Sequence, residues 1–169
     1  MTDDTADPAE KRVGKRLREA DATVATAESC TGGLVGSKIT DIPGSSDYFD
    51  RSLVTYSYEA KRELLAVSRE SLDAHGAVSE PVAVEMAQGV RDTAGTDWGV
   101  ATTGVAGPSG GSSETPVGTV YIAVAEAAPW GTNESGVTVS RYEFDGTRRE
   151  IKASIATQAL QDLETALQE

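Results

Sequence analysis

The sequence predicts an α/β protein with a mixed β-sheet. Runs of small and β-branched residues alternate along the chain with runs whose apolar residues recur every three or four positions, the pattern of strands alternating with helices. The last two strand-like runs follow one another without a helix between them, which predicts an antiparallel hairpin. A length of 169 residues suits one domain with a sizeable core, so we expect residues 1–169 to form a single domain.

The first half of the chain shows the helix and strand signals in turn. Asp7-Pro8 offers a cap and a proline at a helix start. Small and β-branched residues indicate strands, and Gly76 and Pro81 mark the end and start of later helices. The predicted elements are a helix over 7–20, a strand over 22–27, a helix over 34–39, a strand over 52–58, a helix over 59–67, a helical turn over 68–76 and a helix from 79 to about 93.

The second half adds three strands, one loop rich in glycine and a final helix. We predict strands over 97–103, 117–125 and 137–144, the last two joined as a hairpin through the loop near Pro129. The segment 104–111 is the most glycine-dense of the chain, which fits either an anion-binding backbone or a flexible surface loop. Apolar residues four apart predict a helix over 148–163.

Composition narrows the function classes. The formal charge of −12 disfavours non-specific binding to nucleic acid and to anionic membrane surfaces, and points to a small-molecule ligand. The acidic N-terminal segment is unlike a signal peptide, and no apolar run approaches the ~20 residues of a membrane span. A single cysteine, Cys30, excludes an intramolecular disulfide and fits a reducing compartment. We therefore expect a cytoplasmic protein, and the single His and single Cys leave no conventional structural zinc site.

The stretch 25–33 joins a strand-like run to a helix-like run through a small polar turn that contains Ser29. This arrangement would place Ser29 at a helix N-terminus, where free N–H groups favour an oxyanion or a phosphate. Gly32 and Gly33 each cost about 1 kcal/mol of helix propensity relative to alanine, which suggests that a ligand approaches the backbone there. The alternative is that Ser29 or Thr31 only caps the helix.

A serine nucleophile needs a base, and the sequence offers two types. His75 is the only imidazole, but its segment resembles a helix end, so a Ser-His-Asp triad has little support. Lys61 follows a predicted strand and could serve if burial lowered its pKa. Tyr56 could relay a proton. The alternatives are an ordinary solvated lysine and a half-buried strand tyrosine.

Five motifs, in this order, resemble the CinA C-terminal domain family, the nicotinamide-nucleotide amidohydrolases. They are Thr26-Ala-Glu-Ser-Cys-Thr-Gly-Gly33, Val54-Thr-Tyr56-Ser followed by Lys61, His75-Gly-Ala-Val-Ser-Glu80, Gly104-Val-Ala-Gly-Pro108 with Gly110-Gly111, and Pro116-Val-Gly-Thr119-Val. The resemblance covers about residues 13–167. It implies a cytoplasmic three-layer α/β/α sandwich, often dimeric, that deamidates nicotinamide mononucleotide to nicotinic acid mononucleotide and ammonia in pyridine-nucleotide recycling. Some members have a further N-terminal domain, for which we expect no room here.

The resemblance also implies roles for individual residues. Ser29 would be the nucleophile, activated by Lys61 and Tyr56 in metal-free acyl transfer without a cofactor. Arg148 matches an arginine that follows a Gly-Asp pair, although the pair reads Gly146-Thr147 here. The implied substrate contacts are Thr31, Gly32, Thr103, Gly104, Val105, Ala106, Gly107 and Arg148. Two alternatives stay open: an inactive nucleotide-binding module, and an amidase acting on another small amide.

Overall fold

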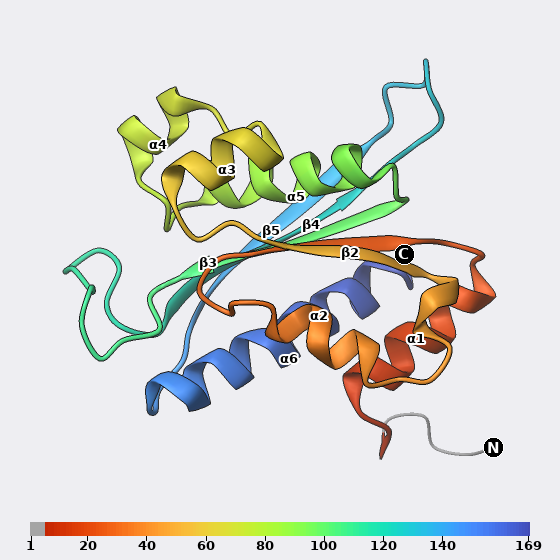
Figure 1. Cartoon of the computed structure of the whole chain (residues 1–169), viewed down its shortest axis with the longest axis horizontal. Coiled ribbons are helices and arrows are strands. Elements are labelled where there is room, and N and C mark those ends of the chain that lie inside the picture. The colour runs from red at the N-terminus through yellow and green to blue at the C-terminus, as the bar shows by residue number, and fades with distance from the viewer. Residues whose placement is uncertain (1–5) are drawn as a thin grey trace.

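A mixed five-stranded sheet lies between two layers of helices in the computed structural model, which describes residues 6–169 (Figure 1). The strand order is β2-β1-β3-β4-β5, with β1 parallel to both β2 and β3 and with β4 antiparallel to β3 and β5. The strands are β1 (Val24–Glu28), β2 (Phe49–Val54), β3 (Trp98–Gly104), β4 (Thr119–Glu126) and β5 (Gly136–Glu143). The α/β class, the three layers and the mixed sheet are thereby confirmed.

The helices divide between the two faces of the sheet (Figure 1). One face carries α1 (Ala9–Glu19), α2 (Leu34–Thr40) and α6 (Arg148–Ala166). The other carries α3 (Tyr58–Leu65), α4 (Arg69–His75) and α5 (Glu80–Ala94). A short 3₁₀ helix, Ser45–Asp47, leads into β2. Across residues 6–169 no helix is both long enough and apolar enough to cross a membrane.

The predicted order of elements is confirmed, but several predicted bounds were wrong. The second strand ends at Val54 rather than at residue 58, because Ser57 caps α3 by accepting a hydrogen bond from the Ala60 N–H. Gly118, at φ +94°, turns the chain so that β4 begins at Thr119. The predicted cap at Asp7 is also corrected, since Pro8 is the N-cap residue of α1 and makes no side-chain cap.

The two faces of the sheet are apolar in different ways. Valine and isoleucine side chains such as Val100 and Ile122 face α1, α2 and α6, whereas alanines such as Ala101 and Ala123 face α3 to α5. Helix α3 in turn lies close against α5: a Cβ added at Gly89 would lie 2.0 Å from the Leu65 carbonyl oxygen. Any side chain at that position would push the two helices apart, so glycine fixes the position of α3.

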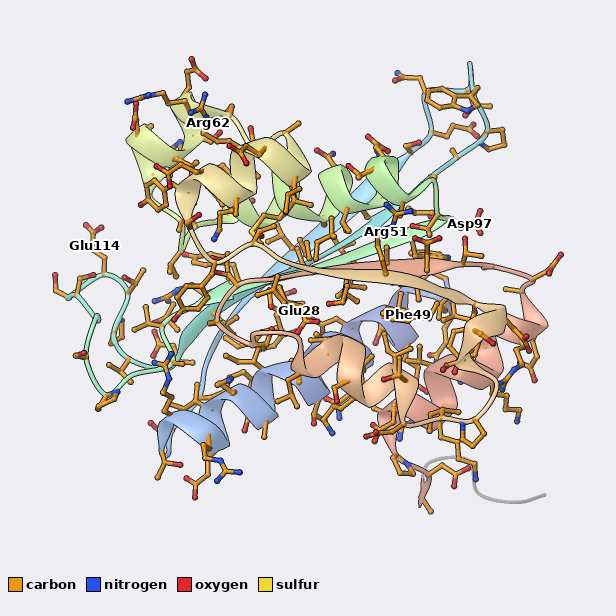
Figure 2. The ribbon with its side chains drawn as sticks, viewed as in Figure 1. Glu28, Phe49, Arg51, Arg62, Asp97 and Glu114 are labelled. Carbon is orange, nitrogen blue, oxygen red and sulfur yellow. The ribbon has the colours of Figure 1, made fainter. Side chains whose placement is uncertain are left out.

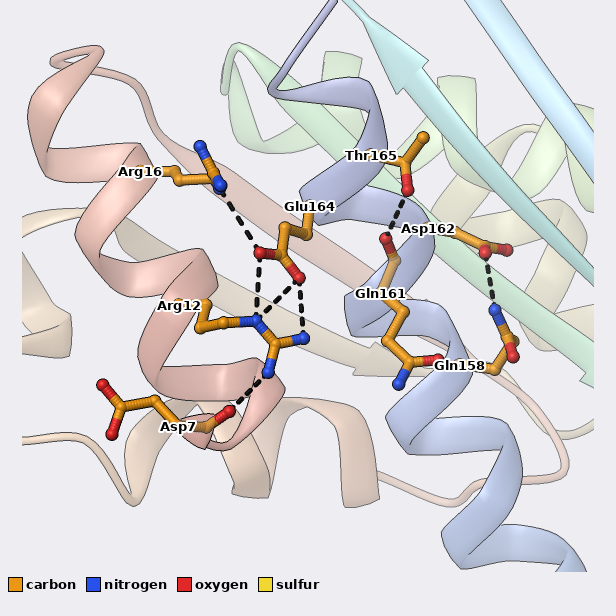
Figure 3. A network of polar contacts seen from close by, with 8 residues as sticks. All are labelled: Asp7, Arg12, Arg16, Gln158, Gln161, Asp162, Glu164 and Thr165. Atoms are coloured by element: carbon orange, nitrogen blue, oxygen red, sulfur yellow. Dashed lines mark hydrogen bonds and ion pairs between the residues drawn. The ribbon is translucent and has the colours of Figure 1, made fainter. Parts of the chain in front are cut away.

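A buried polar cluster joins α1 to α6 (Figure 3). The Glu164 carboxylate accepts hydrogen bonds from Arg12 Nε and Nη2 at 3.0 and 2.8 Å, and from Arg16 Nε at 3.4 Å. The bonds from Arg12 hold the pKa of Glu164 below its ordinary value. This cluster fixes α6, whose first turn, at the other end of the helix, faces the loops described next.

Three parallel strands end at one edge of the sheet. Since β1, β2 and β3 run in the same direction, the segments that follow them meet at that edge, on the left of Figure 1. These segments begin with Ser29, Thr55 and Val105. The predicted nucleophile, base and glycine-rich loop therefore converge for a topological reason.

Candidate active site

Ser29 and Lys61 are in direct contact. Ser29 is the first residue after β1, and its N–H donates to the Thr102 carbonyl oxygen at 3.1 Å, which fixes it beside β3. Lys61 lies in α3, and its Nζ lies 3.0 Å from Ser29 Oγ. The Lys61 side chain is fully buried, with 0 % exposure, so the alternative of a solvated lysine is wrong. The Ser29 hydroxyl therefore lies in hydrogen-bond contact with a buried amine that could act as its base.

The surroundings of Lys61 favour a neutral amine. Its Nζ also lies 2.7 Å from the Thr55 carbonyl oxygen and 3.5 Å from that of Tyr56, and all three neighbouring atoms are neutral oxygens. Burial lowers the pKa of Lys61 to about 8, and the coulombic effect of Cys30 acts in the opposite direction. A neutral amine has two N–H donors for the carbonyls and one lone pair for the Ser29 hydroxyl. The neutral form of Lys61, which becomes the major form above about pH 8, can therefore accept a proton from Ser29.

Tyr56 lies at the rim of the site rather than inside it. Its side chain is 64 % exposed, and its hydroxyl accepts a hydrogen bond from Arg148 Nη2 at 3.3 Å. Arg148 Nη1 donates to the Gly107 carbonyl oxygen at 2.7 Å. The guanidinium of Arg148 thus connects the segment after β2 with the loop after β3.

The glycine-rich loop has a fixed part and an exposed part. Thr103 Oγ1 donates to the Ala77 carbonyl oxygen at 2.7 Å, and the Val105 N–H donates to the Thr119 carbonyl oxygen at 2.8 Å. Gly107 has φ +79°, and a Cβ there would lie 2.4 Å from Val117 Cγ1, so glycine is required. Residues 105–107 are buried, whereas residues 108–114 are exposed. The fixed part borders the site, and the exposed part projects from it.

The first turn of α2 is already occupied by a carboxylate. Glu28, the last residue of β1, is fully buried and lies beside α2 (Figure 2). It accepts hydrogen bonds from the N–H groups of Val35 at 2.8 Å and Gly36 at 2.9 Å. The hydroxyls of Thr31 and Ser52 donate to the same carboxylate at 2.8 and 2.6 Å. The expectation that these N–H groups are free for a phosphate or an oxyanion was therefore wrong. Glu28 satisfies them.

The capping alternative for Ser29 and Thr31 was also wrong. Gly33, at φ +101°, is the N-cap residue of α2 and makes no side-chain cap. Thr31 Oγ1 instead lies 2.8 Å from both Glu28 Oε1 and Thr102 Oγ1, and the Gly32 N–H donates to the Ser29 carbonyl oxygen at 3.1 Å. The turn after Ser29 is held by the contacts of Thr31 with Glu28 of β1 and Thr102 of β3 and by one backbone hydrogen bond. Glu28 had no role predicted from the sequence, because only its position next to Ser29 distinguishes it from the other acidic residues of the chain.

Replacing Glu28 with glutamine is expected to lower the free energy of unfolding by about 1–3 kcal/mol. Glutamine has the same shape, but its NH₂ group would face the N–H of Val35 or of Gly36, and neither group can accept a hydrogen bond. Urea unfolding measures the change, with the exposed Glu59→Gln as the matched control. Equal midpoints for the two variants would show that the carboxylate does not hold the turn.

The remaining candidates do not join this site. Cys30 is buried, and burial raises the pKa of its thiol to about 12, so it stays a neutral thiol. His75 ends α4 and is exposed. Within residues 6–169 no group of three or more His, Cys, Asp or Glu side chains is arranged to hold a metal ion.

Comparison with known proteins shows the family of this chain. The CinA C-terminal domain family matches residues 6–167. The chain is 48 % identical over 164 residues to the nicotinamide-nucleotide amidohydrolase PncC of Escherichia coli (strain K12), covering 96 % of this chain and 95 % of that protein. It is also 48 % identical over 163 residues to a CinA-like protein of Chlorobium limicola, covering 95 % of this chain but only 37 % of that longer protein.

Two crystal structures share the whole fold. The competence/damage inducible protein CihA of Agrobacterium tumefaciens superposes with a TM-score of 0.87 at 38 % identity, covering 95 % of this chain and 94 % of that one. The competence damage-inducible protein A (ComA) of Klebsiella pneumoniae superposes with a TM-score of 0.88 at 32 % identity, covering 96 % and 99 %. The likeness therefore extends over the fold as well as the sequence.

Proposed function

Since the chain belongs to the CinA C-terminal domain family, we propose that it hydrolyses the carboxamide of nicotinamide mononucleotide, giving nicotinic acid mononucleotide and ammonia. One observation carries the proposal: a buried lysine with a lowered pKa lies 3.0 Å from the hydroxyl of a serine at the end of a central strand. The likeness to the E. coli amidohydrolase supports the choice of substrate. The reaction would recycle pyridine nucleotides.

The first half of the proposed reaction forms an acyl-enzyme. Neutral Lys61 accepts the proton of the Ser29 hydroxyl while Oγ bonds to the carboxamide carbon and the carbonyl electrons move to its oxygen. When the tetrahedral species collapses, the C–N bond breaks, and the Lys61 ammonium returns a proton to the leaving nitrogen. Ammonia leaves, and Ser29 carries the acyl group of nicotinic acid mononucleotide, with its ribose phosphate, as an ester.

The second half uses the same base on water. Lys61 takes a proton from a water molecule while the oxygen of that water attacks the ester carbon. The bond between the ester carbon and Ser29 Oγ then breaks. The proton passes from Lys61 to Ser29 Oγ, which restores the hydroxyl, and the acid product loses its own proton to solvent. No metal or other cofactor is needed in this scheme.

Backbone N–H groups are the proposed oxyanion donors. The Gly32 and Val105 N–H groups already donate to carbonyls, so they do not serve. In the part of the chain that the structure describes, the Thr31 and Ala106 N–H groups have no such acceptor, and each would contribute roughly 3 kcal/mol to the transition state. Tyr56 and Arg148, at the rim, would contact the substrate and orient it. Cytoplasmic location and a homodimer stay predictions.

Ammonia release from nicotinamide mononucleotide by the purified protein tests the proposal. We expect release at a rate typical of enzymes, about 1–10³ s⁻¹, at low or at high salt, and far slower release from free nicotinamide or glutamine. Calorimetry with the mononucleotide runs in parallel. Binding without release at either salt concentration would indicate an inactive module, and release only from other amides would indicate a different amidase; either result would contradict the proposal.

A further inference from the structure

We propose that the hollow between the turn Thr31–Leu34 and the first turns of α6 binds the phosphate monoester of the substrate, with Arg149 and Lys152 as its cationic partners. This inference rests on the proposed function and adds a subsite to it. The hollow differs from the glycine-rich segment 104–111, whose composition fits an anion-binding backbone or a flexible surface loop. The hollow adjoins Ser29 through the turn that follows it.

The hollow has a volume of about 530 Å³ and two chemically different walls. One wall is the peptide segment Thr31–Leu34, which begins two residues after Ser29. The other is α6, where Arg149 and Lys152 lie three residues apart and therefore on one side of the helix. An anion in the hollow would meet two cations on one side and the nucleophile's turn on the other.

These two cations are not neutralised by the protein. The chain has 27 acidic and 15 basic residues, yet within residues 6–169 neither Arg149 nor Lys152 forms an ion pair. Glu150, the acidic residue between them, accepts a hydrogen bond from the Thr147 N–H at 2.9 Å in the capping box of α6. A phosphate monoester carries a charge of about −1.5 to −2 at pH 7 and would complement such a pair.

Lys152 lies beside the backbone of the nucleophile's turn. Gly32 is exposed at φ +60°, and a Cβ added there would lie 3.8 Å from Lys152 Nζ. The charge of Lys152 also contributes to lowering the pKa of Cys30, the residue next to Ser29, against the larger effect of burial. The ammonium therefore lies beside the turn that follows the reacting serine.

The other candidate anion sites are occupied. The first turn of α2 already holds the Glu28 carboxylate. Arg148 bonds to the Gly107 carbonyl oxygen and to the Tyr56 hydroxyl, which turns two of its donors away from an incoming anion. Of the cations near the site, Arg149 and Lys152 thus have their donors available to a ligand.

The test compares nicotinamide mononucleotide with the nucleoside that lacks the phosphate. Lys152→Met and Arg149→Gln are each expected to raise KM for the mononucleotide roughly tenfold to hundredfold, with kcat within about threefold. KM for the nucleoside should not change, because it has no group for the hollow. Lys11→Met, the same substitution at an exposed lysine of α1, is the matched control and should leave both constants unchanged.

Several outcomes would overturn the subsite. Equal changes in KM for both substrates would show that the two cations do not contact the phosphate. An effect confined to Arg148→Gln would place the phosphate at the rim instead. Inorganic phosphate should compete with the mononucleotide; phosphate that binds without competing would indicate a separate anion site and contradict the inference.

Calorimetry separates this inference from the proposed function. If no ammonia is released, the proposed reaction fails, but the mononucleotide can still bind. Lys152→Met should then raise the Kd for the mononucleotide by the roughly tenfold to hundredfold expected for KM. Unchanged affinity for the mononucleotide in both Lys152→Met and Arg149→Gln would reject the subsite, whether or not the protein releases ammonia.

Discussion

Ser29→Ala is expected to abolish ammonia release, with a loss in kcat on the order of 10⁶-fold, as in other hydrolases that lose a serine nucleophile. The substitution removes the only hydroxyl that contacts Lys61 Nζ among residues 6–169, and no neighbouring thiol replaces it because Cys30 stays protonated. A coupled assay for ammonia measures the effect. Mass spectrometry of the unsubstituted protein quenched during turnover should find Ser29 esterified by the carboxyl group of nicotinic acid mononucleotide.

The control for this variant is its fold and its ligand binding. Ser29 is 9 % exposed and loses only one hydroxyl, so the midpoint of urea unfolding should change little. Calorimetry should show that the mononucleotide still binds. Residual turnover near the parent rate in a folded Ser29→Ala protein would mean that another group attacks the carboxamide, and the acyl-enzyme scheme would have to be abandoned.

Lys61→Met is expected to lower kcat by roughly 10²–10⁴-fold or more while the protein stays folded. Methionine has a similar length and needs no hydrogen-bond partner, so the main cost to stability is the hydrogen bond that the Thr55 carbonyl oxygen loses, about 1–3 kcal/mol. In the parent protein, kcat/KM should rise with pH through an apparent pKa near 8 as Lys61 becomes neutral. Arg62→Met, an exposed neighbour in the same helix, serves as the control and should keep the parent pH profile.

The stability of the fold gives a second reading of Lys61 that does not depend on turnover. Folding lowers the pKa of Lys61 from 10.5 to about 8, so the unfolded chain binds more protons than the folded chain between those values. The free energy of unfolding should therefore include a contribution from Lys61 that rises as pH increases from about 8 to 10.5. Lys61→Met should lack this rise. The same pH dependence in both proteins would show that Lys61 keeps its ordinary pKa.

The order of elements and the meeting of Ser29 with Lys61 could be predicted from the sequence. Strands and helices follow from the periodicity of apolar residues, which is a local property. The carboxyl ends of parallel strands lie at one edge of a sheet, so residues that directly follow two such strands are brought together. Ser29 and Lys61 were predicted from their places after strand-like runs and from the motifs, and the structure brings Lys61 Nζ to 3.0 Å from Ser29 Oγ, although several strand bounds were wrong where caps and turns decide them.

Other features depend on contacts between distant residues. Tyr56 and Arg148 are far apart in sequence, and the hydrogen bond between them is not encoded by any local pattern. The same is true of the bond from Ser52 to Glu28. A motif lists which side chains are present, but the direction in which each one points depends on the elements packed around it.

The sequence by itself determined the fold class, the family resemblance and the serine and lysine of the candidate site, because short-range patterns and motif order carry that information. Only the tertiary structure decided that Lys61 is buried, that Glu28 occupies the first turn of α2, and that Arg149 and Lys152 face an open hollow. Burial, pKa and free hydrogen-bonding capacity depend on which atoms surround a group in space. Those neighbours come from every part of the chain.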